Sequence, residues 1–253
     1  SIFDIIKVGI GPSSSHTMGP WLAGNHFCSL LQENSFDQIQ IHLYGSLAKT
    51  GKGHGTDIAV VMGLAGFDFT KLTGKILKRE VARIKEMDSL TINDTLIGFK
   101  WTEHLVFHFS EFLPNHPNGL IIKAFKENEM CISQDYYSLG GGFITIGETQ
   151  NPENQRIPST YPCHSAKELL DTTRKLSLSI PELVLLNEQS WFSLEEIENK
   201  CDKLATEMID AIFRGVQQEG TLPGGLNVQR RAKNLHDKLL KKECTYQTPD
   251  SWI

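Results

Sequence analysis

Two short segments place histidine among glycines and either hydroxyl groups or a lysine. The first, Gly9-Ile-Gly-Pro-Ser-Ser-Ser-His-Thr-Met-Gly19, contains Ser13, Ser14, Ser15, His16 and Thr17. Free N–H groups at a helix start attract anions, and neighbouring hydroxyls add donors for a small carboxylate. The serines could instead only cap a helix. Because three hydroxyls and a histidine exceed what a cap requires, we expect an anion-binding site here.

The second segment, Gly51-Lys-Gly-His-Gly55, has three glycines in five residues, with Lys52 and His54 between them. Glycines allow a backbone to approach a ligand closely, and we expect a tight loop here. Histidine titrates near neutral pH and is the commonest general base. The alternative is an ordinary loop with an exposed histidine.

Three further segments could contribute, and each has a simpler explanation. In His116-Pro-Asn118-Gly119 the Asn-Gly pair is a turn signal. The triple glycine of Tyr136-Tyr-Ser-Leu-Gly-Gly-Gly142 could admit a ligand or only shape the entry to a strand. Arg230 and Arg231 could grip a carboxylate with two hydrogen bonds or lie on a solvated helix face.

The elements that must position these residues follow from hydrophobic periodicity. Alternating or short apolar runs predict strands at 39–44, 105–109, 120–125, 130–136 and 143–146. Helical spacing predicts helices over 13–31, 56–64 and 71–87. His108 lies within an alternating strand, and we expect a structural role for it.

From residue 165 onward the pattern is helical. Ser165 and Ser193 each begin a capping-box pattern, with glutamate three residues later. The second opens a long helix with an apolar stripe, which we expect to pack in the core: Ile197, Cys201, Leu204, Met208, Ile212 and Val216. A basic helix is expected at about 228–242.

Composition restricts the class of protein. The chain has 253 residues, 40% apolar residues and a net charge of −5. This composition is typical of a globular protein, and the charge argues against nucleic acid as a partner. No apolar run reaches the ~18 residues needed to span a bilayer, and the first residues do not resemble a secretory signal. We therefore expect a cytoplasmic protein without a membrane segment.

The five cysteines are widely spaced, and no Cys-x-x-Cys pair occurs. We therefore predict no metal site within this chain, and we expect buried or surface thiols in a reducing compartment.

Taken together, these segments resemble the N-terminal (beta) region of bacterial iron–sulfur-dependent L-serine dehydratases. Phe3-Asp-x-x-Lys-Val-Gly-Ile-Gly-Pro-Ser-Ser-Ser-His-Thr-x-Gly-Pro20 resembles the family's opening. Tyr44-Gly-Ser-Leu-x-x-Thr-Gly-Lys-Gly-His-x-Thr-Asp57 resembles its second block, and the other motifs follow in the expected order. The resemblance extends over nearly the whole chain.

The resemblance implies an α+β fold, with a mixed sheet and flanking helices, similar to the allosteric substrate-binding domain of phosphoglycerate dehydrogenase. We expect this domain over residues 1–162 and a helical C-terminal extension, leading toward a cluster-binding domain, over residues 163–253.

The resemblance also implies an activity, in which L-serine is converted to pyruvate and ammonia with the help of a [4Fe–4S] cluster. His54 would be the catalytic base, and His16 and His116 would position the substrate or shuttle protons. The residues implied to bind substrate are Ser13, Ser14, Ser15, Thr17, Lys52, Asn118, and Arg230 or Arg231.

The family's cluster cysteines lie in a second region, and none of the five cysteines here matches a ligand motif. We therefore expect the cluster ligands outside this chain and no activity from this chain alone. The expected partners are L-serine, a cluster-binding domain or subunit, and further copies in a homo-oligomer.

Two alternatives remain from the sequence. One is a non-catalytic serine-sensing or small-anion-binding domain, which would not need His54 in its glycine frame. The other is a metal hydrolase with His16, His54 and His116 as ligands, although no His-x-x-x-His pair supports it.

Overall fold

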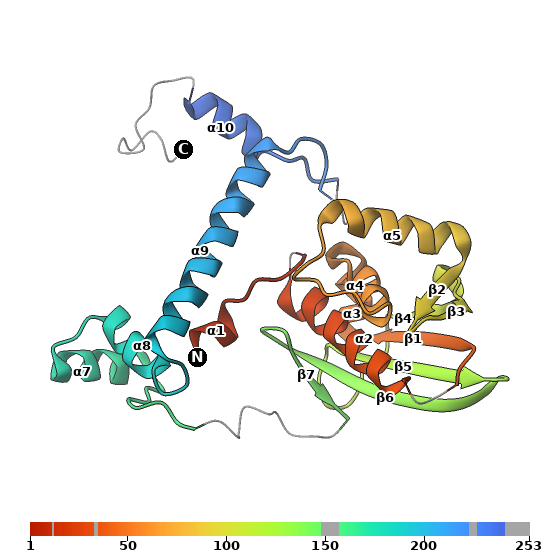
Figure 1. Ribbon diagram of the computed structural model, residues 1–253, viewed down its shortest axis with the longest axis horizontal. Coiled ribbons are helices and arrows are strands. Elements are labelled where there is room, and N and C mark those ends of the chain that lie inside the picture. Colours follow the sequence, from red (N-terminus) through yellow and green to blue (C-terminus); the bar gives the residue numbers. More distant parts are fainter. Residues whose placement is uncertain (12, 33–34, 148–156, 223–226, 241–253) are drawn as a thin grey trace. The chain divides into compact units, whose positions relative to one another are not determined.

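The computed structural model describes residues 1–11, 13–32, 35–147, 157–222 and 227–240. These residues form two compact units. The sheet unit comprises the described residues from 9 to 147, and the helical unit comprises those of 1–8, 157–222 and 227–240. Figure 1 shows the helices and strands of both units with their labels.

The sheet unit combines runs of helices with runs of strands, as expected for an α+β fold. Its elements are a π-helical turn η1 (Ser14–Met18), α2 (Gly19–Leu30), β1 (Gln38–Tyr44), α3 (Gly45–His54), α4 (Thr56–Leu64), α5 (Gly74–Met87), β2 (Ser89–Ile92), β3 (Thr95–Gly98), α6 (Trp101–His104), β4 (Leu105–His108), β5 (Gly119–Lys126), β6 (Glu129–Gly140) and β7 (Phe143–Ile146).

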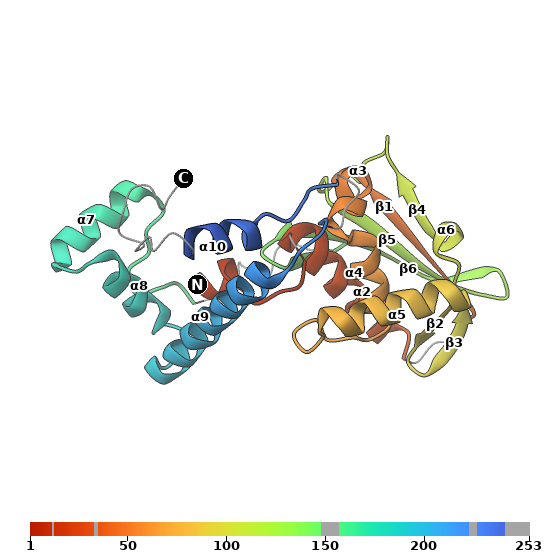
Figure 2. The ribbon, with the colours of Figure 1, turned by 90° about the horizontal axis from the view of Figure 1, so that it is seen from above.

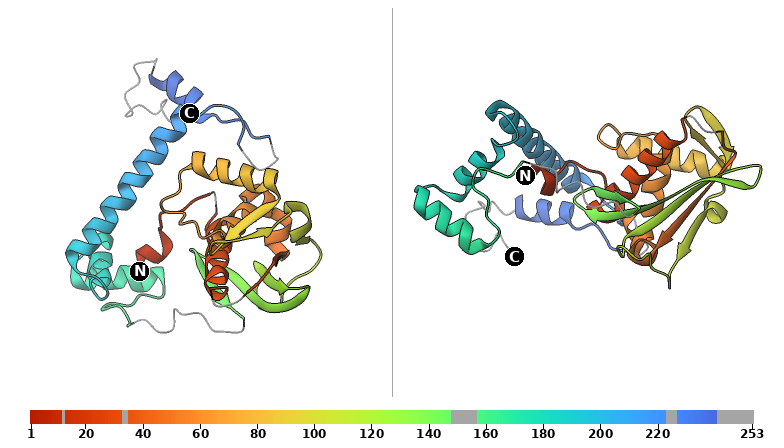
Figure 3. Two further views of the ribbon diagram at one scale, coloured as in Figure 1. Left: turned by 45° about the vertical axis from the view of Figure 1, so that its right-hand side comes forward. Right: turned by 90° about the horizontal axis from the view of Figure 1, so that it is seen from below.

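The main sheet has five strands in the order β4-β1-β5-β6-β7. β1 pairs in parallel with β4, and the other pairs are antiparallel, so the predicted mixed sheet is confirmed. Ile39, Ile41 and Leu43 are fully buried, whereas the residues between them are half-buried. The buried side faces the helices, and α2 and α4 flank that side in Figures 2 and 3. The likeness to the phosphoglycerate dehydrogenase domain stays a prediction.

Helices α2 and α4 cross with almost no space between their backbones. A Cβ built on Gly24 would lie 2.5 Å from the Val60 carbonyl oxygen, and one on Gly63 would overlap the Trp21 carbonyl oxygen. Trp21 is buried, and its indole N–H donates to the Phe67 carbonyl at 2.8 Å. Close packing of these two helices therefore depends on glycine at both positions.

A hairpin of β2 and β3 was not predicted. Its two-residue turn, Asn93-Asp94, has positive φ at both positions, as a type I′ turn requires. The sequence shows only four residues on each side of this turn, and too few alternate for the strand pattern to stand out.

The expectation of a tight loop at residues 51–55 is wrong for most of these residues. Residues 51–54 form the last turn of α3, and Gly55 alone leaves it, in the left-handed conformation with φ +67°. Gly51 is buried in α3 and would bring a Cβ to 3.1 Å from the Thr56 side chain. The glycines were therefore misread as loop residues; one is a helix C-cap and another is a packing contact.

The helical unit comprises α1 (Ile2–Ile5), α7 (Ala166–Leu176), α8 (Ile180–Glu188), α9 (Leu194–Gln217) and α10 (Ala232–Leu240). The capping box at Ser193 is confirmed, and a second one occurs at Ser179. At Ser165 only half of the pattern forms: the Ser165 hydroxyl accepts from Glu168 N–H, but the Glu168 carboxylate accepts from His164 N–H. None of the described helices is long and apolar enough to span a membrane.

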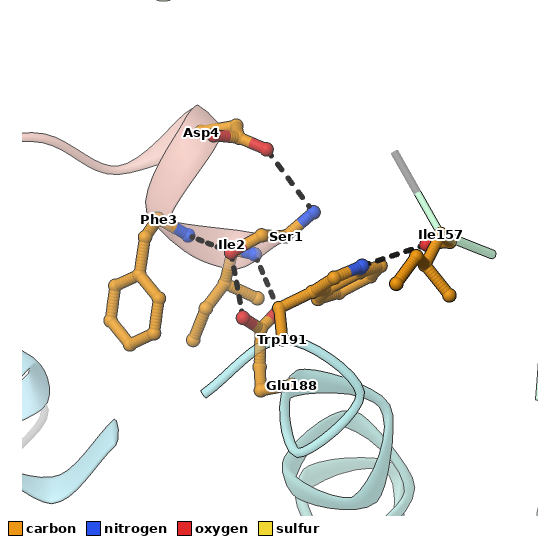
Figure 4. A network of polar contacts seen from close by, with 7 residues as sticks. All are labelled: Ser1, Ile2, Phe3, Asp4, Ile157, Glu188 and Trp191. Atoms are coloured by element: carbon orange, nitrogen blue, oxygen red, sulfur yellow. Dashed lines mark hydrogen bonds and ion pairs between the residues drawn. The ribbon is translucent and has the colours of Figure 1, made fainter. Parts of the chain in front are cut away.

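A buried glutamate holds α1 in this unit (Figure 4). The Glu188 carboxylate accepts from the Ser1 hydroxyl at 2.6 Å and from the Ile2 N–H at 2.8 Å. Nearby, the Trp191 indole donates to the Ile157 carbonyl at 2.7 Å. The Phe3 ring meets the Phe192 ring edge-on.

The expectation that the α9 stripe packs in the core is wrong. Ile197 is buried, but Cys201, Met208 and Ile212 are exposed. Leu204 and Val216 are half-buried, so the helix has the expected amphipathic pattern but the described residues cover its apolar side only in part.

Candidate functional site

His54 lies in the last turn of α3, half-buried. Its Nδ1 is 2.9 Å from the Thr50 carbonyl oxygen, one helical turn earlier. A carbonyl oxygen only accepts, so Nδ1 carries the proton and Nε2 is left with its lone pair. Among the described residues no hydrogen bond is formed by Nε2. In the neutral form of the ring, Nε2 is therefore the acceptor nitrogen that a base requires.

Ser46, Thr50 and His54 follow one another at four-residue intervals, so they share one face of α3. Ser46 begins this face, and its N–H donates to the Pro117 carbonyl at 2.9 Å. Sequence reasoning missed both Ser46 and Thr50. Their spacing would have revealed them if residues 51–54 had been read as helix.

His16 uses both ring nitrogens within the site. Nδ1 is 2.9 Å from the Ser15 hydroxyl, and Nε2 is 2.9 Å from the Ser46 hydroxyl. Its ring lies against the His54 ring, with centroids 4.9 Å apart. Burial, followed by repulsion from His54, lowers the pKa of His16, against a smaller opposing effect of Ser46. His16 is therefore neutral at pH 7.

Two hydroxyl groups join the first and second motifs reciprocally. Thr17 donates from its hydroxyl to the His54 carbonyl at 2.9 Å, and Thr56 donates to the His16 carbonyl at 2.6 Å. Both threonines are buried. The main-chain carbonyl of each histidine is thus held by a threonine of the other motif. The Thr17 hydroxyl donates its hydrogen in this bond.

The three serines have different surroundings. Ser13 caps the π-helical turn, and its hydroxyl accepts from His16 N–H at 3.2 Å. Ser14 is exposed, and its hydroxyl accepts from Gly141 N–H at 3.2 Å, which brings the triple-glycine segment to the site. An accepting hydroxyl keeps its own hydrogen to donate. Ser14 therefore has a donor available for an anion.

The His116 segment reaches the site through its main chain. Pro117 accepts from Ser46 N–H, as described above, and His116 Nδ1 accepts from Asn118 N–H at 3.1 Å. The Asn118 amide donates to the Ser138 carbonyl at 3.1 Å. Asn118 therefore has a structural partner, and the third and fourth motifs are joined to each other.

Three predicted ligands are not joined to this cluster by an identified contact. The Lys52 ammonium lies over the Phe107 ring, 5.1 Å from its centroid. Arg230 and Arg231 belong to the helical unit. Their roles as substrate ligands stay predictions.

A second histidine pair, His42 on β1 and His108 at the end of β4, lies apart from the His16–His54 cluster. His42 Nδ1 is 3.0 Å from His108 Nε2, and His108 Nδ1 is 2.9 Å from the Glu111 carboxylate. Burial, then Lys123 and His108, lower the pKa of His42 to about 4, while Glu111 acts in the opposite direction.

The described residues do not fit an iron–sulfur cluster. They contain no group of three or more His, Cys, Asp or Glu side chains that could hold a metal ion. The described cysteines are free, differ in burial and are far apart in sequence, three of them on separate helices or strands and Cys163 before α7: Cys28, Cys131, Cys163 and Cys201. This arrangement also gives no support to the metal-hydrolase alternative.

Comparison with known proteins identifies the family. The family model described as serine dehydratase beta chain matches residues 1–149, and so includes both histidine motifs and the His116 and triple-glycine segments. The chain belongs to the serine dehydratase beta-chain family.

Named relatives agree with this assignment to the serine dehydratase family. The chain is 39% identical to L-serine dehydratase TdcG of Escherichia coli, over 98% of this chain and 56% of that protein. It is 35% identical to L-serine dehydratase of Streptomyces coelicolor, over 100% of this chain and 58% of that protein. The corresponding values for Haemophilus influenzae L-serine dehydratase are 38%, 94% and 54%. The chain thus spans little more than half the length of these relatives.

Proposed function

We propose that this chain supplies the catalytic base and substrate-binding side chains of an L-serine dehydratase, which converts L-serine to pyruvate and ammonia. One observation carries the proposal: the Thr50 carbonyl fixes the Nδ1 proton of His54 and leaves Nε2 as an acceptor. The α-proton of serine is weakly acidic, so its removal needs a positioned base. His54 is that base.

The surrounding residues have distinct roles in this proposal. Ser14, with Ser13 and Ser15 beside it, binds the substrate carboxylate through hydroxyl donors. His16 and Thr17 position His54, His16 by ring contact and Thr17 by its hydrogen bond. His116, Asn118, Lys52 and either Arg230 or Arg231 complete the predicted set of substrate ligands. In this proposal polypeptide outside this chain holds the [4Fe–4S] cofactor, so the role of this chain ends with the α-proton and the carboxylate.

The test combines this chain with a complementing polypeptide, defined as the part of E. coli TdcG outside the 56% that this chain matches. Pyruvate formation from L-serine is measured anaerobically with iron and sulfide. We expect pyruvate from the mixture and none from the chain alone. In the mixture, His54→Gln should lower kcat by about 10²- to 10⁴-fold, because a positioned base is lost.

His164→Gln is the matched control, because His164 is an exposed histidine of the helical unit. The kcat of this variant should equal that of the wild type. Turnover of His54→Gln within threefold of the wild type would remove His54 as the base. If L-serine bound without turnover in the presence of a loaded cluster, the serine-sensing alternative would replace the proposal. The cytoplasmic location and the homo-oligomer stay predictions.

A further inference from the structure

Helix α9 presents an uncovered apolar surface. We call it the α9 face and define it as Cys201, Met208, Ile209, Ile212 and Phe213. The exposed fractions of its four large side chains are 61% for Met208, 52% for Ile209, 64% for Ile212 and 61% for Phe213. Soluble proteins rarely leave such an apolar cluster in water, and an exposed cluster of this kind marks a surface that another protein or domain covers.

Helical geometry makes this surface continuous. Residues 201, 208 and 212 lie close together on the wheel, and residues 209 and 213 extend the surface to one side. The opposite side carries Lys203, Asp210 and Arg214. The helix is therefore amphipathic, with an apolar side suited to a partner and a polar side suited to water.

The described part of this chain supplies little packing for α9. Of its 24 residues only Ile197 is buried. Helices in proteins are stabilised mainly by packing of their apolar side, so a long helix with one buried residue lacks most of that support. That support would have to come from a surface outside the described residues.

We propose that the α9 face packs against the part of L-serine dehydratase that this chain does not match. The alignments with TdcG and with the S. coelicolor relative take in 98% and 100% of this chain, so they include the α9 region. In both relatives more than two fifths of the protein has no counterpart here. That remaining polypeptide is large enough to cover one side of a helix. Its contacting surface is apolar, because a polar one would be left unpaired against Met208 and Ile212.

The experiment uses two native thiols of the full chain. Cys201 lies on the α9 face, and Cys131, on β6 of the sheet unit, is also exposed and serves as an internal reference. Maleimide labelling of both is followed by mass spectrometry, with and without the complementing TdcG polypeptide. Labelling of Cys201 should slow by at least about tenfold on binding, while the rate at Cys131 stays constant.

A pair of matched variants separates this surface from the rest of α9. Met208→Lys/Ile212→Lys should weaken binding of the complementing polypeptide by about 100-fold, because two central apolar contacts become charged. Asp210→Lys changes the charge by the same two units on the opposite, exposed side of the helix and should bind as the wild type does. Circular dichroism of each variant checks that helix content is retained.

Three results would overturn the proposal: no binding of the complementing polypeptide, binding that leaves Cys201 labelling unchanged, or protection of Cys201 in the chain alone. In the last case, dependence on protein concentration would identify a second copy as the occupant, and independence would identify another part of the same chain. Pyruvate from the mixture separates the two proposals: if it forms while Cys201 labelling stays unchanged, this proposal alone fails, whereas loss of turnover in His54→Gln bears only on the base.

Discussion

His54 is oriented by a main-chain carbonyl and not by a carboxylate. A carboxylate on Nδ1 would stabilise the protonated ring, whereas the Thr50 carbonyl fixes the tautomer without adding a negative charge. In the proposed role His54 must also release its proton in each cycle, and this weaker stabilisation favours that release. Neutral His16, packed against the His54 ring, adds no opposing charge either.

Ser46 should affect catalysis without contacting the substrate. Ser46→Ala removes the partner of His16 Nε2, so the ring that packs against His54 loses one of its two anchors. We expect kcat in the complemented enzyme to fall about 5- to 10-fold, the usual value of one hydrogen bond, with KM nearly unchanged. Ser29→Ala, at an exposed serine of α2, is the control. An unchanged kcat for Ser46→Ala would contradict the positioning role of His16.

His42 should make stability depend on pH. Its pKa is about 4 in the folded chain and near 6.5 when unfolded, so between these values the unfolded state binds more protons. The His42 contribution is therefore complete above pH 6.5 and is lost as the pH falls toward 4. Urea denaturation at several pH values should show a smaller decrease over this range for His42→Gln than for the wild type. Equal decreases would show that His42 is not the group responsible.

The residue types of the site were predictable, but part of its geometry was not. The two histidine motifs stand out because glycine, serine and histidine are concentrated within a few positions. The bonds of Thr17 and Thr56 to the opposite motif depend on how η1, α3 and α4 pack together, and no local sequence pattern indicates that packing. Ser46 and Thr50 were missed for another reason, since glycines at 51 and 53 concealed a helix.

At the scale of elements, the crossing of α2 and α4 is the most sensitive contact. Gly63→Ala would place a Cβ against the Trp21 carbonyl, and backbone cannot move aside as a flexible side chain can. We expect a loss of roughly 1–3 kcal/mol in the free energy of unfolding, measured by urea denaturation. Gly74→Ala, at the start of α5 with open space around it, should be neutral or slightly stabilising. Equal stabilities of the two variants would contradict this account of the crossing.

Strand prediction succeeded where one side of a strand is buried and failed where the strand is short. β1 alternates over seven residues between buried and half-buried positions, and the same period appears in its sequence. β2 and β3 have four residues each and depend on the Asn93-Asp94 turn. For α9 the periodicity was read correctly, but periodicity cannot tell whether the surface that covers a helix belongs to the same chain.

At the scale of the whole molecule, nearly all core residues belong to the sheet unit. The core cluster runs from Trp21 to Tyr136, while the buried apolar residues of the helical unit are Leu183 and Ile197. A fragment of residues 9–147 should therefore fold alone, with a cooperative thermal transition by circular dichroism. A fragment of residues 157–240 should show a broad transition or none. Cooperative melting of the second fragment and not the first would reverse this assignment. The expected boundary at residue 162 stays a prediction.

The reciprocal threonine bonds also bear on when the site comes into being. They join residues 37 and 40 positions apart, across β1 and α3. Contacts of such sequence separation form late, because the intervening chain must first be ordered. During synthesis His16 is added 40 residues before Thr56. A nascent chain therefore contains the serine-rich turn before it contains the threonine that binds the His16 carbonyl. In refolding, helix content should accordingly return earlier than the paired geometry of His16 and His54.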